Sequence, residues 1–303
     1  MSCKICEKNS VINLPNSNIY QCRKCFNRYF EKKVRKTIRI YKLIDKKDVI
    51  GIAASGGKDS MSTLYILNKI LKHQNIKLMA LAIDEGIEGY RNLAFLKNFC
   101  KENKIPLHTF SYKKEFGHTL DKMLKITKEK PCSICGVFRR YLLNTKAKKL
   151  GITKLATGHN LDDEAQTILM NQFRRNISAS ARLGPITGVI QDERFIRRIK
   201  PLYFLTEREI AAFAFLNNLK DEYVECPNAA VSYRCNLRDW LNEIEAKYPG
   251  TKHSIVNSFM EIQPILRKHL DLKKIKTCKI CAEPCSQDIC QACKLADKLK
   301  LLN

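Results

Sequence analysis

A chain of 303 residues with 45% hydrophobic residues is long enough for one large core with appended modules. Its 55 lysines and arginines against 30 acidic residues give a net charge of +25, which favours a polyanion such as nucleic acid over a merely solubilising lysine-rich surface. The sequence contains no run of about 18 apolar residues, which a membrane-spanning helix would need. The opening Met1–Lys4 does not begin a signal region, so we expect a cytoplasmic protein.

Residues 1–26 contain two Cys-x-x-Cys pairs. Cytoplasmic thiols stay reduced, so such pairs indicate a metal rather than disulfides. Four thiolates close a tetrahedral shell and leave no position for a substrate, which predicts a structural zinc. The predicted ligands are Cys3, Cys6, Cys22 and Cys25.

Residues 27–47 form a basic link whose apolar side chains, among them Phe30, Val34 and Ile38, recur at helical spacing. We expect a helix packed on the core. Its charged face is suited to phosphates and equally to plain solvation.

Residues 48–220 alternate short apolar runs with amphipathic stretches, which predicts an α/β domain with a parallel sheet covered by helices on both faces. Ligands of such sheets bind beyond the carboxyl ends of the strands. Ser55, Asp84 and Gly158 each follow a predicted strand. The predicted strands cover 48–54, 77–83, 106–110 and 154–157, and the predicted helices cover 61–73, 90–103, 136–150 and 161–173.

The run Ser-Gly-Gly-Lys-Asp-Ser at 55–60 links the first strand directly to a helix. Its glycines allow backbone amides to turn toward an anion, and the helix start adds its dipole and free N–H groups. The common P-loop pattern fails here, because Ile52 occupies its first glycine position and Asp59 follows the lysine. The run therefore predicts a phosphate cradle of a different kind.

A third cysteine group combines Cys132 and Cys135 with Cys226, which lies in a loop before a proline. Three thiolates leave one position open on a cubane cluster, and such soft sites favour iron–sulfur or zinc. Cys235 is an alternative to Cys226. A cluster-free alternative has Cys132 or Cys226 carrying a persulfide.

The remainder is predicted to be a helical extension over residues 221–274, with helices over 237–246 and 262–270 after another over 207–218, and a second zinc module over 275–303. The module again holds two Cys-x-x-Cys pairs, and Cys285 is an alternative ligand. Its predicted ligands are Cys278, Cys281, Cys290 and Cys293.

The run at 55–60 resembles the SGGxDS signature of the PP-loop ATP pyrophosphatases. In that family the loop holds the β- and γ-phosphates while a substrate oxygen attacks the α-phosphate. Together with the flanking zinc modules, the Pro131–Gly136 segment and the Ala156–Ala165 segment, the chain resembles the tRNA 2-thiouridine synthetases of archaea and bacteria and their eukaryotic cytosolic relatives. The resemblance covers nearly the whole chain.

This resemblance implies ATP-dependent tRNA 2-thiolation, in which the uridine C2 oxygen is adenylated and sulfur then displaces AMP. It implies ATP, Mg²⁺ and a [4Fe-4S] cluster on Cys132, Cys135 and Cys226. Arg139 stands where the family often has a lysine, and it cannot donate a proton as an amine would. The implied catalytic residues are Cys132, Cys226, Asp163, Lys58 and Asp59. The implied nucleotide-binding residues are Ala53, Ala54, Ser55, Gly56, Gly57, Lys58, Asp59, Ser60, Asp84, Gly158 and Arg139, with Asp84 equally explained as a turn residue.

The partners implied are tRNA and a sulfur donor, either sulfide or a ubiquitin-like thiocarboxylate carrier, and the family is compatible with a homodimer. Candidate RNA contacts are the link at 32–47, Arg174-Arg175, Arg194–Lys200 and the zinc modules. Positions 34 and 54 of tRNA are both open. The alternatives are a tRNA 2-thiocytidine synthetase, another PP-loop tRNA-modifying ligase, or a non-catalytic zinc-ribbon adaptor that binds tRNA.

Overall fold

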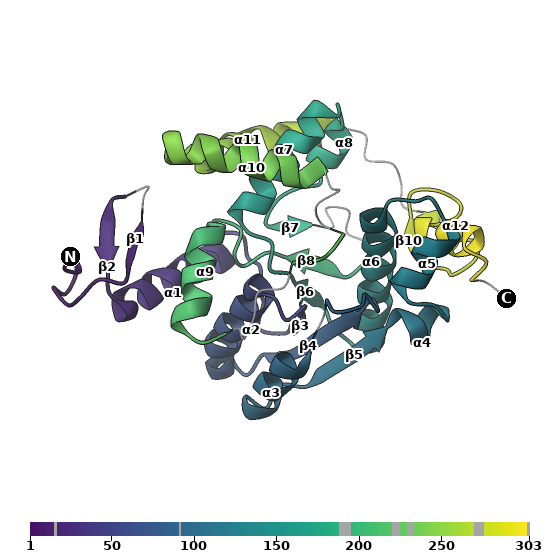
Figure 1. The fold of residues 1–303 in the computed structure, drawn as a ribbon, viewed down its shortest axis with the longest axis horizontal. Helices are drawn as coiled ribbons and strands as arrows, with labels where there is room; N and C mark the ends of the chain where they lie inside the picture. Colours follow the sequence, from purple (N-terminus) through teal and green to yellow (C-terminus); the bar gives the residue numbers. More distant parts are fainter. Residues whose placement is uncertain are drawn as a thin grey trace.

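The computed structural model describes residues 1–14, 17–90, 92–187, 195–219, 225–228, 233–269 and 276–301. The hairpin of β1 (Ile12–Leu14) and β2 (Ile19–Gln21) stands at one end of the molecule. The C-terminal module lies at the other end (Figure 1). The module consists of β9 (Lys276–Thr277), β10 (Pro284–Cys285) and α12 (Gln291–Lys298).

A six-stranded sheet lies between these ends, in the order β5-β4-β3-β6-β8-β7. All neighbours pair in parallel except β7 with β8, so the predicted α/β class is confirmed. The short strands β7 and β8 escaped prediction, because β8 opens with two arginines and does not show an apolar run. The strands are β3 (Val49–Ala53), β4 (Lys77–Asp84), β5 (Leu107–Ser111), β6 (Lys154–Ala156), β7 (Ile186–Thr187) and β8 (Arg197–Ile199).

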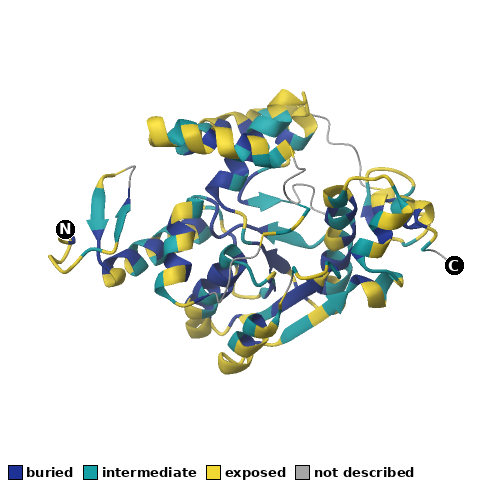
Figure 2. Cartoon of the chain, in the orientation of Figure 1, coloured by how far each residue is buried: buried dark blue, intermediate teal, exposed yellow. Residues whose placement is uncertain are grey.

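Helices bury both faces of the sheet, as the dark inner surfaces in Figure 2 show. Ile50 and Ile52 of β3 join one core with α1, α2 and α9, while Leu81 and Ile83 of β4 join a second core with α6. This alternation is the two-residue repeat of strands. The helices are α1 (Arg23–Ile40), α2 (Lys58–Leu71), α3 (Ala94–Glu102), α4 (Tyr112–Phe116), α5 (Leu120–Ile126), α6 (Pro131–Lys149), α7 (Leu161–Phe173), α8 (Ile177–Ser180), α9 (Glu207–Leu216), α10 (Tyr233–Lys247) and α11 (Thr251–His269), with a 3₁₀ turn η1 (Lys72–Gln74).

Helix α6 begins earlier than we expected. The prediction placed its start at Gly136, but the helix starts at Pro131, where a proline at the first helical position is favoured because its missing N–H has no partner there. Cys132 and Cys135 therefore lie in the first turns of a helix and not in a loop.

The basic link is part of the main core. Phe26, Phe30 and Val34 of α1 are fully buried, and the Phe30 ring stacks on Phe213 of α9 with centroids 3.8 Å apart. Helices α10 and α11 pack on α7 through Leu241, Val256 and their neighbours. No helix in the described ranges is long and apolar enough to cross a bilayer.

Candidate active site

The run at 55–60 comprises the loop after β3 and the first residues of α2, which begins at Lys58. Gly56 has φ of +81°, a backbone conformation that side chains disfavour, so glycine is required there. The Ser55 hydroxyl donates to the Ser60 hydroxyl at 3.1 Å, and Ser60 donates to the Gly57 carbonyl at 3.0 Å. Gly57 is the N-cap residue of α2, and it has no side chain that could accept a hydrogen bond from the amides of the first turn. These amides therefore suit an anion.

Gly158 lies in the loop after β6 and packs against this loop. A Cβ atom at Gly158 would lie 2.8 Å from the Asp59 carbonyl carbon and 3.0 Å from the Ser60 nitrogen. Both neighbours are backbone, so only glycine allows the two loops to approach this closely. Ala53 is the last residue of β3 and Ala54 follows it, beside the carboxyl end of β6. A role of these two alanines in nucleotide binding stays a prediction.

Lys58 is held by two carboxylates. Its Nζ donates to Asp59 Oδ2 at 3.0 Å and to Glu207 Oε1 at 2.8 Å. Burial opposes the positive charge, but these carboxylates outweigh it and raise the pKa of Lys58. Asp59 Oδ1 also accepts from Asn160 Nδ2 at 3.1 Å. Sequence reasoning missed Glu207, because it lies 149 positions from Lys58 with no local signal of this contact.

Asp163 is both a helix cap and a cavity wall. Its N–H donates to the Asn160 side chain at 3.0 Å, and its carboxylate accepts the Asn160 N–H at 3.3 Å, which forms a capping box for α7. Burial raises the pKa of Asp163 to about 6, against the opposing charge of Arg234 and with a contribution from Asp59. A carboxyl group poised near neutral pH suits acid–base work.

A cavity of about 330 Å³ brings most of the predicted catalytic residues together at the carboxyl edge of the sheet. It joins the end of the PP-loop to the third cysteine group, which is far away in sequence. Its lining includes Asp59, Cys132, Cys135, Arg139, Asp163 and Cys226 among the predicted residues, and Glu85, Glu207, Arg234 and Cys235 among others.

Asp84 is exposed and does not belong to the lining of this cavity. Its Oδ1 accepts the Gly86 N–H at 2.9 Å, which is the turn role that the sequence left open. The next residue, Glu85, is 1% exposed and lies 3.6 Å from Arg139, with both side chains at the cavity. A nucleotide role for Asp84 stays a prediction.

Cys132, Cys135 and Cys226 are not arranged to share a single ion. Among the described residues, the groups of three or more ligand atoms lying within 4.8 Å of one another are the two four-cysteine groups, and Cys132, Cys135 and Cys226 do not form another. Ligands of a four-iron cluster bind different irons and so stand farther apart than ligands of one ion. Cys132 Sγ lies 3.9 Å from the Asn228 carbonyl oxygen, which places the start of α6 beside the Cys226 loop.

Both terminal cysteine groups have the geometry of a tetrahedral metal site. Metal–sulfur bonds of about 2.3 Å separate the sulfurs of a tetrahedral zinc by about 3.8 Å. The separations are 3.4 Å for Cys6–Cys22 and 3.7 Å for Cys281–Cys290. Burial works to raise the pKa of Cys278, but hydrogen bonds from backbone N–H groups, including that of Cys290 at 3.3 Å, lower it to about 6. The alternative ligand Cys285 stays outside the group and contacts Gln287.

Arg139, Arg234 and Arg238 line the cavity, and Arg139 lies near further cations. Burial and the repulsion of Arg140 and Arg139 lower the pKa of Arg198 to about 10. Burial and the nearby cations, first among them Lys200, lower the pKa of His159 to about 3, so this histidine is neutral at physiological pH. Lys200 is buried and pairs with Glu164 at 2.6 Å, so it faces the core and not an RNA partner; Arg194 lies outside the described residues.

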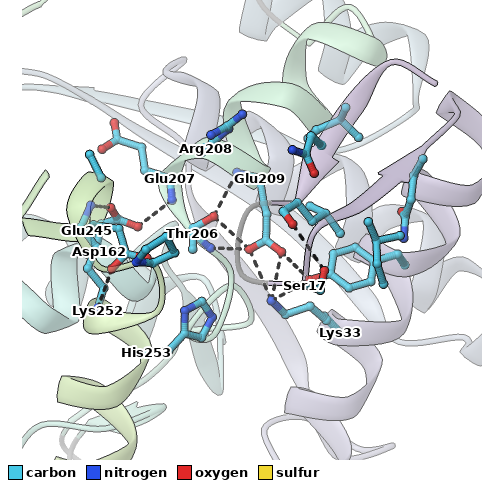
Figure 3. Close-up of a pocket in the computed structure, with 18 of the residues that line it drawn as sticks. Ser17, Lys33, Asp162, Thr206, Glu207, Arg208, Glu209, Glu245, Lys252 and His253 are labelled. Atoms are coloured by element: carbon cyan, nitrogen blue, oxygen red, sulfur yellow. Dashed lines mark hydrogen bonds and ion pairs between the residues drawn. The ribbon is translucent and has the colours of Figure 1, made fainter. Parts of the chain in front are cut away.

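A second pocket of about 760 Å³ lies between the N-terminal hairpin and helices α1, α9, α10 and α11 (Figure 3). In it, Asp162 accepts the Glu207 N–H at 2.7 Å and pairs with Lys252 of α11, both side chains being buried. Lys33 of α1 pairs with Glu209 at 3.1 Å. The α11 extension is thus tied to the residue that holds Lys58.

Comparison with known proteins identifies the family. The model of the PP-loop domain family matches residues 27–243. A probable sulfurtransferase of Methanocaldococcus jannaschii is 41% identical over 94% of this chain and 84% of its own length. The tRNA-5-methyluridine(54) 2-sulfurtransferase of Pyrococcus horikoshii is 38% identical over 100% of this chain and 96% of its own length. The chain belongs to the PP-loop tRNA 2-thiolation family.

A solved structure agrees with this assignment of the PP-loop protein. The U34-tRNA thiolase NcsA from Methanococcus maripaludis, solved with its [4Fe-4S] cluster, matches with a TM-score of 0.83 and 32% identity. The match covers 100% of this chain and 98% of that one. The resemblance drawn from the sequence motifs is therefore confirmed at the level of the family and of the fold.

Proposed function

We propose that this protein is an ATP-dependent tRNA sulfurtransferase that converts a uridine to 2-thiouridine. The observation that carries the proposal is the single cavity that joins Asp59 of the PP-loop and Asp163 to Cys132, Cys135 and Cys226. Adenylation of the uridine C2 oxygen releases pyrophosphate and creates a good leaving group. A sulfur nucleophile then takes the place of AMP at C2.

The residues of the PP-loop have distinct roles in this reaction. The amides at the start of α2 and the charge of Lys58 bind the β- and γ-phosphates. The carboxylates of Asp59 and Asp163 suit Mg²⁺, which takes oxygen ligands from carboxylates and phosphates. Arg139 contributes positive charge and phosphate contacts, and not a proton.

Cys132, Cys135 and Cys226 would hold a [4Fe-4S] cluster, and the fact that their sulfurs do not all lie within 4.8 Å of one another supports this over a single ion. When bound, the cluster supplies one iron that these three cysteines leave open, at which a sulfur atom can be presented to the activated uridine. The two terminal groups would each hold a structural zinc, which keeps no open position.

The tRNA meets this site through its phosphates. Arg139, Arg140 and Arg198 converge near the cavity, and their repulsion is relieved by a polyanion. Binding should weaken steeply with salt, as counterion release requires. A sulfide or thiocarboxylate donor, a homodimer and a cytoplasmic location accompany the proposal as predictions from the sequence.

The test is pyrophosphate release from ATP by anaerobic holoprotein given total tRNA and sulfide, with mass spectrometry of the tRNA. We expect 2-thiouridine, and fragment masses decide between positions 34 and 54, the two that relatives' names carry. Formation of 2-thiocytidine would favour the first alternative enzyme. Tight tRNA binding without pyrophosphate release, in the wild type as in Asp163→Asn, would favour the non-catalytic tRNA-binding adaptor.

A further inference from the structure

The active-site cavity holds a fourth cysteine that the proposed reaction does not use. Cys235 stands in the first turn of α10 and lines the cavity together with Cys132, Cys135 and Cys226. It is partly exposed, as Cys135 and Cys226 are. Four cysteines therefore line one small space from three separate segments of the chain.

Its two arginine neighbours hold this turn in place. Arg234 donates to Gln166 Oε1 at 3.2 Å and to Thr167 Oγ1 at 2.9 Å, both on α7. One turn further on, Arg238 donates at 3.1 Å to Glu225, the residue before Cys226.

The start of α10 is therefore fixed against α7 on one side and against the Cys226 loop on the other.

We propose that Cys235 is a fourth thiolate ligand of the cluster in the resting enzyme, bound to the iron that the other three cysteines leave open. This inference rests on the proposed function, because it requires the cluster. A thiolate is a soft ligand that suits iron, and the geometry offers it from the same cavity. Cys235 leaves when hydrosulfide enters: one anionic sulfur ligand replaces another, so no oxidant or reductant is needed.

The experiment uses iron-57-loaded holoprotein prepared anaerobically, as wild type, Cys235→Ala and the matched control Cys285→Ala from the C-terminal module. Mössbauer spectroscopy separates an iron with four sulfur neighbours from one that carries an oxygen ligand. We expect four equivalent sulfur environments in wild type and in the control. In Cys235→Ala we expect the same iron content with one distinct iron.

A second measurement on the wild type does not depend on any variant folding. Cys235 should react with iodoacetamide in cluster-free protein, be protected in holoprotein, and react again after sodium sulfide is added. A wild-type cluster that already contains one distinct iron, with Cys235 reactive throughout, overturns the proposal and leaves the proposed function intact. Loss of the cluster in Cys235→Ala with retention in Cys226→Ala also overturns it, because Cys235 would then be an obligatory ligand. Wild-type protein that takes up no iron overturns both the proposal and the proposed cluster.

Discussion

Lys58 of the PP-loop and Glu207 at the start of α9, which lines the active-site cavity, form an ion pair of 2.8 Å. Both residues also contact other parts of the site: Lys58 pairs with Asp59, and the Glu207 N–H is bound by Asp162. The pair occupies the one lysine of the loop before any phosphate arrives. It therefore links nucleotide binding to the helical extension, since Asp162 is held by Lys252 of α11.

Replacing Glu207 with glutamine should tighten ATP binding. The carboxylate competes with phosphates for Lys58 and repels them, and a partly exposed pair of this kind contributes about 0.2–1 kcal/mol, or up to about fivefold in Kd. Calorimetric titration with Mg²⁺ and a non-hydrolysable ATP analogue measures the change. Glu31→Gln, which disrupts a surface ion pair with Arg35 and Lys69, is the matched control and should change nothing. Weaker binding in Glu207→Gln would mean that Glu207 orients Lys58.

Asp163 should set the acid limb of the pH profile. With its pKa raised to about 6, pyrophosphate release should rise as pH increases through about 6 and then level off. Asp163→Asn should lower turnover by about 100-fold or more and remove this limb. A variant that keeps the limb would assign it to another group.

The same shift of the pKa predicts the effect on stability. Because the pKa of Asp163 in the folded protein lies above its ordinary value of 3.8, this carboxyl stabilises the fold below pH 3.8 and loses its contribution as pH rises through about 6. Asp163→Asn should therefore be at least as stable as wild type at pH 8, since the amide oxygen can still accept the Asn160 N–H. Denaturant unfolding at pH 8 measures this, and a large loss of stability would mean that the capping role dominates.

Gly158→Ala should displace the PP-loop. The added methyl group would meet the backbone of Asp59 and Ser60, which cannot rotate away, so we expect about 1–3 kcal/mol of destabilisation and weakened ATP binding. Gly136→Ala is the control for unfolding measurements, because its methyl group meets only the flexible side chain of Arg140. Equal unfolding temperatures for both variants would contradict the close packing of the two loops.

The terminal cysteine groups should each retain a zinc ion, about two per chain. Cys281→Ser should halve the zinc content measured by elemental analysis, because it breaks one four-thiolate shell. It should also lower the unfolding temperature, since this module shares a core with α6 through residues such as Ala292. Cys285→Ser should keep its zinc. If Cys285→Ser instead holds half the zinc, then Cys285, and not Cys281, is the fourth ligand.

Local spacing in the sequence determined much of this protein. The cysteine pairs, the loop at 55–60 and the alternation of strands and helices are short-range patterns, and their chemistry depends on neighbours a few residues apart. They were sufficient for the α/β fold, the family and the three cysteine groups. The strand β8 was not visible, because a three-residue strand that opens with two arginines lacks the apolar run of a buried strand.

Only the tertiary structure decided which distant groups meet. Packing of α9 on α2 brings Glu207 to Lys58, and packing of α10 on α7 brings Cys235 beside the other three cavity thiols. At the end of β4, Glu85 lines the cavity, while the carboxylate of Asp84 accepts a hydrogen bond within the turn that follows. Such contacts arise from the shape of the folded core, and no spacing of residues along the chain specifies them.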